Sequence, residues 1–243
     1  MKIFEIEEYL NSILKPEEFN DYCHNGVQVE CDRDIKKVAV GVSFNFEFAE
    51  KALENGADLL LVHHGIFGKD FFSLKGFLKK RVGLLIKNDI GLIGYHLPLD
   101  AHPVYGNNAS IMKKLGINDF LPFEVGFKGE FSPEVPFDEF LEKMSKIIPR
   151  DKFIYYKNND YVKKIGVLSG GGSAYMNSLE NEIDTYLTGE VKEHVRDVAR
   201  EMKINFINCG HYSTETFGVK NLATLLEDKF NLETFFIDYY NEV

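Results

Sequence analysis

Histidines and carboxylates cluster at three places in the sequence, a pattern typical of metal sites. His63 and His64 are adjacent and directly follow an apolar run, in a chain that has seven histidines. Asp100 follows another apolar run, and its carboxylate is a hard donor suited to a divalent cation. His211 and Glu215 come after a third run, four residues apart, so a helix would place both on one face. Such nitrogen and oxygen donors bind zinc, iron or manganese.

Each cluster also has an explanation that needs no metal. His63 and His64 are then partly exposed loop residues, and Glu215 interacts with the dipole of a helix start. His102 precedes Pro103 and is better explained as a solvated residue. Considered together, however, five donors from three strand ends fit a two-metal site with open positions better than a closed tetrahedral zinc site.

The surrounding elements predict how these donors come together. Strand-like apolar runs cover residues 36–42, 58–62 and 91–95, and helical patterns lie between them. This alternation predicts βαβ units and a largely parallel sheet, and therefore an α/β fold. The candidate ligands follow the carboxyl ends of strands, where α/β folds place their ligands. Pro98 argues against His96 and Asp100 lying on one face of an ordinary helix.

The second half of the chain resembles the first. Residues 163–168 and 184–187 are strand-like runs of the same kind as the first two, with similar spacing. We therefore predict two similar α/β halves, residues 1–125 and 126–243, that arise from an internal repeat and share a metal-binding cleft.

Several other segments have weaker assignments. Residues 169–173 follow a strand and are rich in glycine, so they form either a phosphate cradle of backbone N–H groups or a plain tight turn. A helix is expected from residue 190 to 202, with His194 on its surface. Another is expected through residues 137–148, ending at Pro149.

Composition limits the classes of function. The chain has 243 residues, a net charge of −10 and three cysteines. This charge disfavours broad binding to nucleic acid or anionic lipid, and the few cysteines favour a reducing compartment. No apolar run is long enough to cross a bilayer, and the acidic N-terminus does not resemble a signal peptide. We expect a cytoplasmic protein without a membrane partner.

Longer motifs give the chain a specific resemblance. It resembles the YbgI-like family of dinuclear-metal proteins, named after a factor that interacts with a transcription regulator and often called GTP cyclohydrolase I type 2 homologues. The motifs that carry the resemblance lie, in order, at residues 21–29, 61–65, 96–102, 106–108, 169–172, 188–190 and 210–215. The chain departs from the family in one place. Many relatives have an aromatic residue, often Trp, soon after the His-His-Gly motif, whereas here Gly68 follows Phe67 and the chain has no Trp.

The resemblance implies a ligand for each candidate position. Glu215 would bridge two divalent ions, with His64 and Asp100 on one ion and His63 and His211 on the other. The resemblance also implies a fold of two similar α/β halves, in the short form that has no inserted domain between them. The chains would assemble into a ring-shaped homohexamer with the sites facing an inner cavity.

Two functions remain open from the sequence. The first is a metal-dependent hydrolase in which His96, close to the metals by resemblance, or Glu190 accepts or donates a proton. Its substrate would be a small molecule, a nucleotide or another phosphorylated or cyclic metabolite. The second is a non-enzymatic role in metal handling, regulation or protein interaction.

Overall fold

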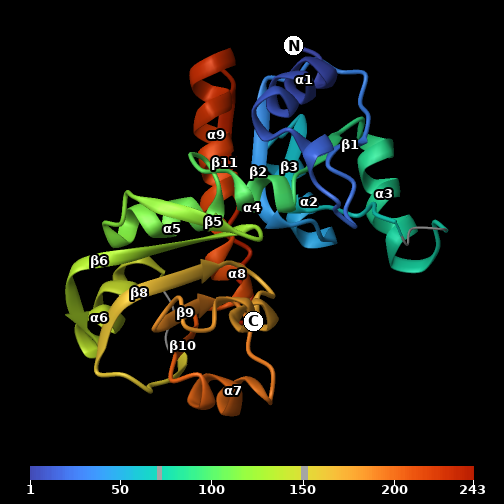
Figure 1. The fold of residues 1–243 in the computed structure, drawn as a ribbon. Helices are drawn as coiled ribbons and strands as arrows, with labels where there is room; N and C mark the ends of the chain where they lie inside the picture. The colour runs from blue at the N-terminus through green and yellow to red at the C-terminus, as the bar shows by residue number, and fades with distance from the viewer. Residues whose placement is uncertain (70–72, 149–152) are drawn as a thin grey trace. The chain divides into compact units, whose positions relative to one another are not determined.

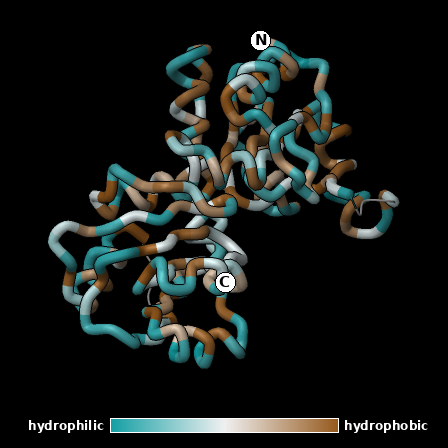
Figure 2. The backbone as a smooth tube through the Cα atoms, in the orientation of Figure 1, coloured by the Kyte–Doolittle hydropathy of each residue, from teal (hydrophilic) through white to brown (hydrophobic). Residues whose placement is uncertain are grey.

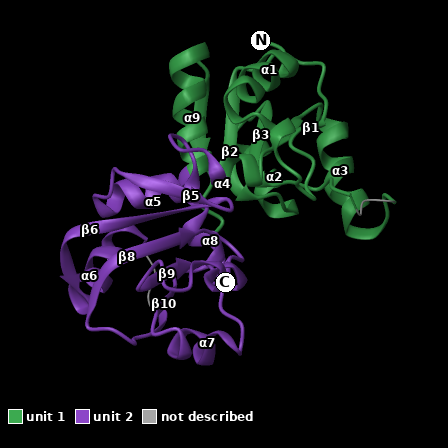
Figure 3. Cartoon of the chain, viewed as in Figure 1, with its two compact units in different colours: residues 1–99, 218–239 green, residues 100–217, 240–243 purple. Residues whose placement is uncertain are grey.

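The described residues form two compact units. The structure, a computed structural model, describes residues 1–69, 73–148 and 153–243 (Figure 1). Unit 1 consists of Met1–Leu99 and Gly218–Tyr239, and unit 2 consists of Asp100–Phe217 and Tyr240–Val243 (Figure 3).

Unit 1 is built on a mainly parallel sheet. In its described residues five strands have the order β1–β4–β3–β2–β11, and β1 is antiparallel to β4 while the other neighbours are parallel. This confirms the predicted parallel βαβ arrangement. The strands are β1 (Gly26–Val29), β2 (Lys37–Ser43), β3 (Leu59–His64), β4 (Gly91–Gly94) and β11 (Glu233–Phe236).

Helices cover both faces of this sheet. Val38 and Val40 of β2 pack in one core cluster with residues of α1 and α9, whereas Ala39 between them packs with α2 and α3. Along the tube of α9 hydrophobic and hydrophilic positions alternate, as expected for a helix with one buried face (Figure 2). The helices are α1 (Ile3–Leu14), η1 (Pro16–Glu18), α2 (Phe46–Glu54), α3 (Gly76–Asn88), α4 (Leu97–Ala101) and α9 (Thr216–Phe230).

Unit 2 contains a mixed sheet. Its described strands have the order β5–β6–β8–β9–β10–β7, and only β8, β9 and β10 are mutually parallel. The expectation of a largely parallel sheet therefore holds only for its centre. The strands are β5 (Phe120–Phe123), β6 (Gly126–Pro136), β7 (Ile154–Tyr156), β8 (Tyr161–Leu168), β9 (Thr185–Thr188) and β10 (Asn205–Asn208).

The faces of the second sheet are also covered. Leu187 of β9 packs in a cluster with residues of α5 and α6, and Tyr186 packs with residues of η2 and α7. The unit is therefore again a sheet between two helical layers. Its helices are α5 (Asn107–Leu115), α6 (Phe137–Ile147), η2 (Ser173–Leu179), α7 (Val195–Glu201) and α8 (His211–Thr214).

The compact units divide the chain differently from the predicted halves 1–125 and 126–243. β11 pairs in parallel with β2, so the chain returns to the first sheet near its C-terminus. Ile111 and Leu115 pack with Phe127 in the core of unit 2, which assigns α5 to that unit.

One local prediction was wrong. The helix predicted from residue 190 starts at Val195, directly after the exposed His194. Pro98 lies in the first turn of α4, where a proline removes an N–H group that has no partner within the helix, and His96 lies before this helix. Pro149, the predicted end of α6, lies outside the described residues.

One structural device occurs in both units. The carboxylate of Asp58, before β3, accepts hydrogen bonds from the backbone N–H groups of Lys36 and Lys37 at 2.9 and 3.0 Å. Asp184, before β9, accepts the N–H groups of Lys163 and Lys164 at 3.1 and 2.7 Å. In each unit, therefore, an aspartate directly before one strand is hydrogen-bonded to the backbone of the parallel neighbouring strand.

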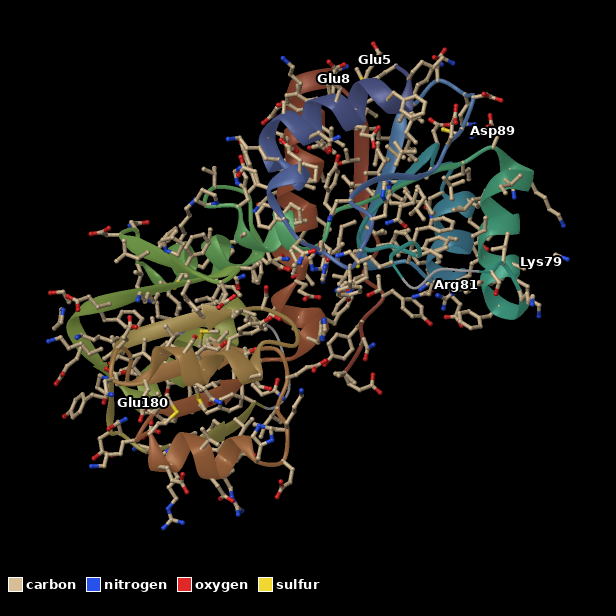
Figure 4. The ribbon with its side chains drawn as sticks, turned by 45° about the vertical axis from the view of Figure 1, so that its right-hand side comes forward. Glu5, Glu8, Lys79, Arg81, Asp89 and Glu180 are labelled. Carbon is tan, nitrogen blue, oxygen red and sulfur yellow. The ribbon has the colours of Figure 1, made fainter. Side chains whose placement is uncertain are left out.

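Acidic side chains lie on the surface of unit 1. Glu5 and Glu8 project outward from α1, opposite the buried Ile6 and Leu10 (Figure 4). Within the described ranges, no helix combines the length and apolar character that crossing a membrane requires.

Candidate metal centre

His63 and His64 end β3, and each ring is fixed through its Nδ1 atom. The Nδ1 atom of the buried His63 lies 2.8 Å from the carbonyl oxygen of Tyr95. Because a carbonyl oxygen only accepts, this nitrogen carries the hydrogen and Nε2 has the lone pair. The Nδ1 atom of His64 lies 2.9 Å from the Oγ atom of Ser43, its partner on β2. The two ring centroids are 4.6 Å apart.

His96 is held by a buried carboxylate. Its Nδ1 atom lies 2.9 Å from Oδ1 of Asp21, whose side chain is 2% exposed. Asn25 donates to Asp21 at 3.0 Å and accepts the backbone N–H of His96 at 2.7 Å. Burial alone would raise the pKa of Asp21, but the hydrogen bonds that it accepts outweigh this and hold the pKa well below its usual range. Asp21 is therefore ionised at neutral pH and keeps the hydrogen on Nδ1 of His96.

The three imidazoles of unit 1 form one cluster. The ring centroid of His96 lies 5.1 Å from that of His63 and 5.6 Å from that of His64. One ring nitrogen from each residue lies within 4.8 Å of the others. Histidines that bind metals usually donate their other ring N–H to a carbonyl or carboxylate oxygen, as His63 and His96 do. The donor set suits zinc, iron or manganese.

In unit 2 the carboxylate of Asp100 is fixed by two side chains. Its Oδ1 atom accepts from Nδ2 of Asn107 at 2.9 Å and from Oγ of Ser169 at 2.8 Å. Asn108 donates to the backbone oxygen of Asp100 at 3.2 Å and accepts the N–H of Ser169 at 2.6 Å. Since Asp100 is 4% exposed, these bonds set the orientation of a buried carboxylate.

His211 lies between two carboxylates of the same unit. Its Nδ1 atom is 2.6 Å from Oε1 of Glu190, and its Nε2 atom is 3.2 Å from Oε1 of the buried Glu215. Burial alone would lower the pKa of His211, but the hydrogen bonds and charges of Glu215 and Glu190 outweigh it and raise the pKa to about 9. The two carboxylates therefore favour a positive charge at His211.

Gly170 allows a loop to approach these ligands. It has a φ of +63°, and an added Cβ atom would overlap with Oε1 of Glu215 and lie 3.1 Å from Nε2 of His211. A side chain at this position would therefore disturb both candidate ligands, as well as straining the backbone.

The same loop does not have the features of a phosphate cradle. The N–H of Ser169 donates to Asn108, the N–H of Gly170 donates to Oγ1 of Thr214, and the N–H of Gly172 donates to the carbonyl oxygen of Gly170. Three N–H groups of the loop are thus used within the unit, so the plain tight turn is the better description.

The structure places every predicted site residue. His63, His64 and His96 cluster in unit 1, and unit 2 holds Asp100, Glu190, His211 and Glu215. Two of the remaining histidines, His24 and His102, have local contacts. The Nδ1 atom of His102 accepts the backbone N–H groups of Val104 and Tyr105, and Nε2 of His24 lies 3.2 Å from the carbonyl oxygen of Val27.

The residues that orient the candidate site through hydrogen bonds had no role predicted from the sequence. Asp21, Ser43 and Asn107 fix the candidate ligands, yet none of them belongs to a histidine cluster. The signal closest to Asp21 is its place four residues before Asn25, next to a turn that leads into β1.

Comparison with known proteins identifies relatives over almost the whole chain. The family model described as Duf34/NIF3 (NGG1p interacting factor 3) matches residues 1–242. A Haemophilus influenzae protein named GTP cyclohydrolase 1 type 2 homolog is 37% identical over 249 residues, covering 99% of both chains.

Solved structures extend the similarity to the fold. The structure of protein ybgI, described as of unknown function, is 33% identical with a TM-score of 0.94 and covers 100% of both chains. Protein TTHA1606 from Thermus thermophilus is 35% identical, again with a TM-score of 0.94 and 100% of both chains covered. The resemblance found in the motifs is thereby confirmed over the whole chain.

Proposed function

Because the chain belongs to the Duf34/NIF3 (NGG1p interacting factor 3) family, we propose that it is a metal-dependent hydrolase with a dinuclear centre. The proposed substrate is a nucleotide or another phosphorylated or cyclic metabolite, in keeping with the name of its relatives. The proposed ligands are His63, His64, Asp100, His211 and Glu215.

The observation that carries this proposal is the anchoring of the imidazoles. His63, His96 and His211 each direct Nδ1 at an oxygen atom that only accepts, and His64 directs Nδ1 at a hydroxyl group. Anchoring at Nδ1 leaves Nε2 as the atom that His63, His64 and His211 offer to a metal and that His96 offers to a proton. A packing role would not require the same orientation in four separate rings.

In the proposed hydrolysis, the metal ions and the side chains of the site have separate roles. When bound, a pair of divalent ions lowers the pKa of water and stabilises negative charge that develops on the substrate. In this proposal Nε2 of His96 accepts a proton from the attacking water, and the carboxylate of Asp21 stabilises the resulting imidazolium. The contact of Glu190 with Nδ1 of His211 supports a positioning role for Glu190.

Elemental analysis is the experiment that tests the centre. We expect about two zinc, iron or manganese ions per chain in protein purified without added metal or chelator. In Glu215→Gln the metal content should fall, because an amide binds a divalent ion more weakly than a carboxylate. Asp228→Asn, an exposed residue of α9, is the matched control and should retain its metal.

Turnover tests the hydrolase. A panel of nucleotides and phosphoesters should contain a substrate whose hydrolysis stops on chelation and resumes when the identified metal is added back. Persistent turnover in metal-free protein would exclude the proposal.

An interaction role is the second candidate, and the family description favours it because it names an interacting factor. This role predicts metals that exchange readily. It also predicts Glu215→Gln protein that loses a partner while no substrate is turned over by the wild type.

A further inference from the structure

A cavity lies beside His64, in unit 1. Its volume is about 340 Å³, and two loops form it: residues 65–69, directly after β3, and Tyr22 with Cys23, before β1. Small-molecule sites measure roughly 300–1,000 Å³. The size therefore suits a small metabolite and not a polymer.

The backbone holds the two loops together. Cys23 and Gly68 form an antiparallel bridge, and the N–H of Lys69 donates to the carbonyl oxygen of Tyr22 at 2.8 Å. An added Cβ atom on Gly68 would overlap with that carbonyl oxygen, so the close approach requires glycine. The pocket is thus formed before a ligand arrives, which lowers the entropic cost of binding.

Aromatic rings line one part of the pocket. Tyr22 is 62% exposed and Phe67 is half-buried. The ring centroid of Tyr22 lies 5.1 Å from that of His96 in an edge-on arrangement. Aromatic faces bind flat ligand rings by stacking, whatever the identity of the ring.

A cation lies at the rim. The ammonium of the exposed Lys69 donates to Oδ1 of Asn20 at 2.8 Å, which holds the group at the pocket and uses one of its three N–H donors. Ammonium groups bind phosphate through charge-assisted hydrogen bonds. The pocket therefore combines an apolar aromatic wall with a site for an anion.

We propose that this pocket binds a planar heterocycle carrying one phosphate group, with the ring against Tyr22 and Phe67 and the phosphate at Lys69. The inference rests on the proposed hydrolase, since His64 joins the pocket to the candidate metal centre. It goes further by naming the residues that select the substrate and the class that they select.

Calorimetric titration with adenosine 5′-monophosphate tests the pocket. Adenosine lacks the phosphate and ribose 5-phosphate lacks the heterocycle, so each should bind at least about tenfold more weakly than the nucleotide. Lys69→Gln should weaken nucleotide binding about tenfold, whereas Lys69→Arg should retain it. The control is Lys36→Gln, an exposed lysine at the opposite, amino-terminal end of the parallel strands, which should bind like the wild type.

The aromatic wall has its own test. Tyr22→Ala should weaken nucleotide binding about tenfold and Tyr22→Phe should preserve it, because the ring and not the hydroxyl makes the contact. The pocket assignment falls if Lys69→Gln and Tyr22→Ala both bind the nucleotide like the wild type, even where metal-dependent turnover is found. Conversely, residue-dependent binding in protein without metal or turnover upholds the pocket and rejects the hydrolase.

Discussion

At the residue scale, the oxygen atom behind each histidine decides how strongly that ring attracts a proton or a metal. His63 faces a neutral carbonyl oxygen, whereas His96 and His211 face the carboxylates of Asp21 and Glu190. A carboxylate raises the basicity of the opposite ring nitrogen more than a neutral oxygen does. We therefore expect His96 to be the better proton acceptor and His63 to be a neutral ligand.

Replacing Asp21 with Asn should destabilise the metal-free protein by about 1–3 kcal/mol at pH 7, since a buried charged hydrogen bond to His96 is lost. The folded-state pKa of Asp21 lies below its unfolded value of 3.8, so this contribution is present above that pH and is lost as the pH falls. The difference from the wild type should thus shrink between pH 6 and about pH 3 in urea titrations. Asp228→Asn should show no such difference, and a gap that widens in acid would contradict the assignment.

Two effects of substituting Gly170 can be separated: backbone strain and contact of the new side chain with the candidate ligands. Gly170→Ala should lower stability by about 1–2 kcal/mol through its positive φ, and it should also reduce the metal content, because the new Cβ atom overlaps with Glu215. Gly56 has a φ of +74° and no atom within 4 Å of an added Cβ, so Gly56→Ala is a control with strain alone. Calorimetric melting and elemental analysis on both variants distinguish the effects. Equal metal content in the two would contradict the proposed role.

At the scale of elements, continuous apolar runs were the reliable signal. β2 and β3 were predicted from such runs, because strands buried on both faces lack polar positions. β5 and β7 are half-exposed edge strands whose short sequences carry no comparable pattern. Pro98 is compatible with α4 because the effect of a proline depends on its position in the helix, which the sequence alone does not fix.

The site was predictable only in part, for a related reason. Histidines beside strand ends stand out by type and position, whereas Asp21 reaches His96 from a loop 75 residues earlier in the chain. Spacing rules describe neighbours within one element, so contacts between elements stay hidden until the fold is known. Glu190 was found as a strand-end residue, but its contact with His211 became visible only in the structure.

At the same scale, the side chain of Gln28 in β1 holds the loop after β3 through hydrogen bonds. Its Oε1 atom accepts the N–H groups of Ile66 and Phe67 at 2.7 and 3.2 Å, and its Nε2 atom donates to the carbonyl oxygen of His24 at 2.8 Å. Gln28→Leu should leave these N–H groups without an acceptor and speed their hydrogen exchange by at least about tenfold. Gln28→Glu keeps an acceptor and should restore most of the protection at Ile66 and Phe67. Unchanged exchange in Gln28→Leu would show that other contacts hold the loop.

At the scale of the whole molecule, the matching contacts of Asp58 and Asp184 support the proposed internal repeat. Each carboxylate joins the start of a strand to its parallel neighbour, at corresponding places in the two sheets. The compact units nevertheless differ from simple sequence halves, because a late strand joins the first sheet.

The family resemblance implies that the chains assemble into a homohexamer. Each chain carries a net charge of −10. Like charges oppose association, and dissolved salt screens them over about 10 Å at 0.1 M. We therefore expect light scattering to give a mass near six times 27.9 kDa at 0.3 M salt, with more dissociation at 0.01 M. A single-chain mass at both salt concentrations would reject the hexamer. Dissociation that increases with salt would instead show that ion pairs between copies, and not apolar contacts, hold the assembly together.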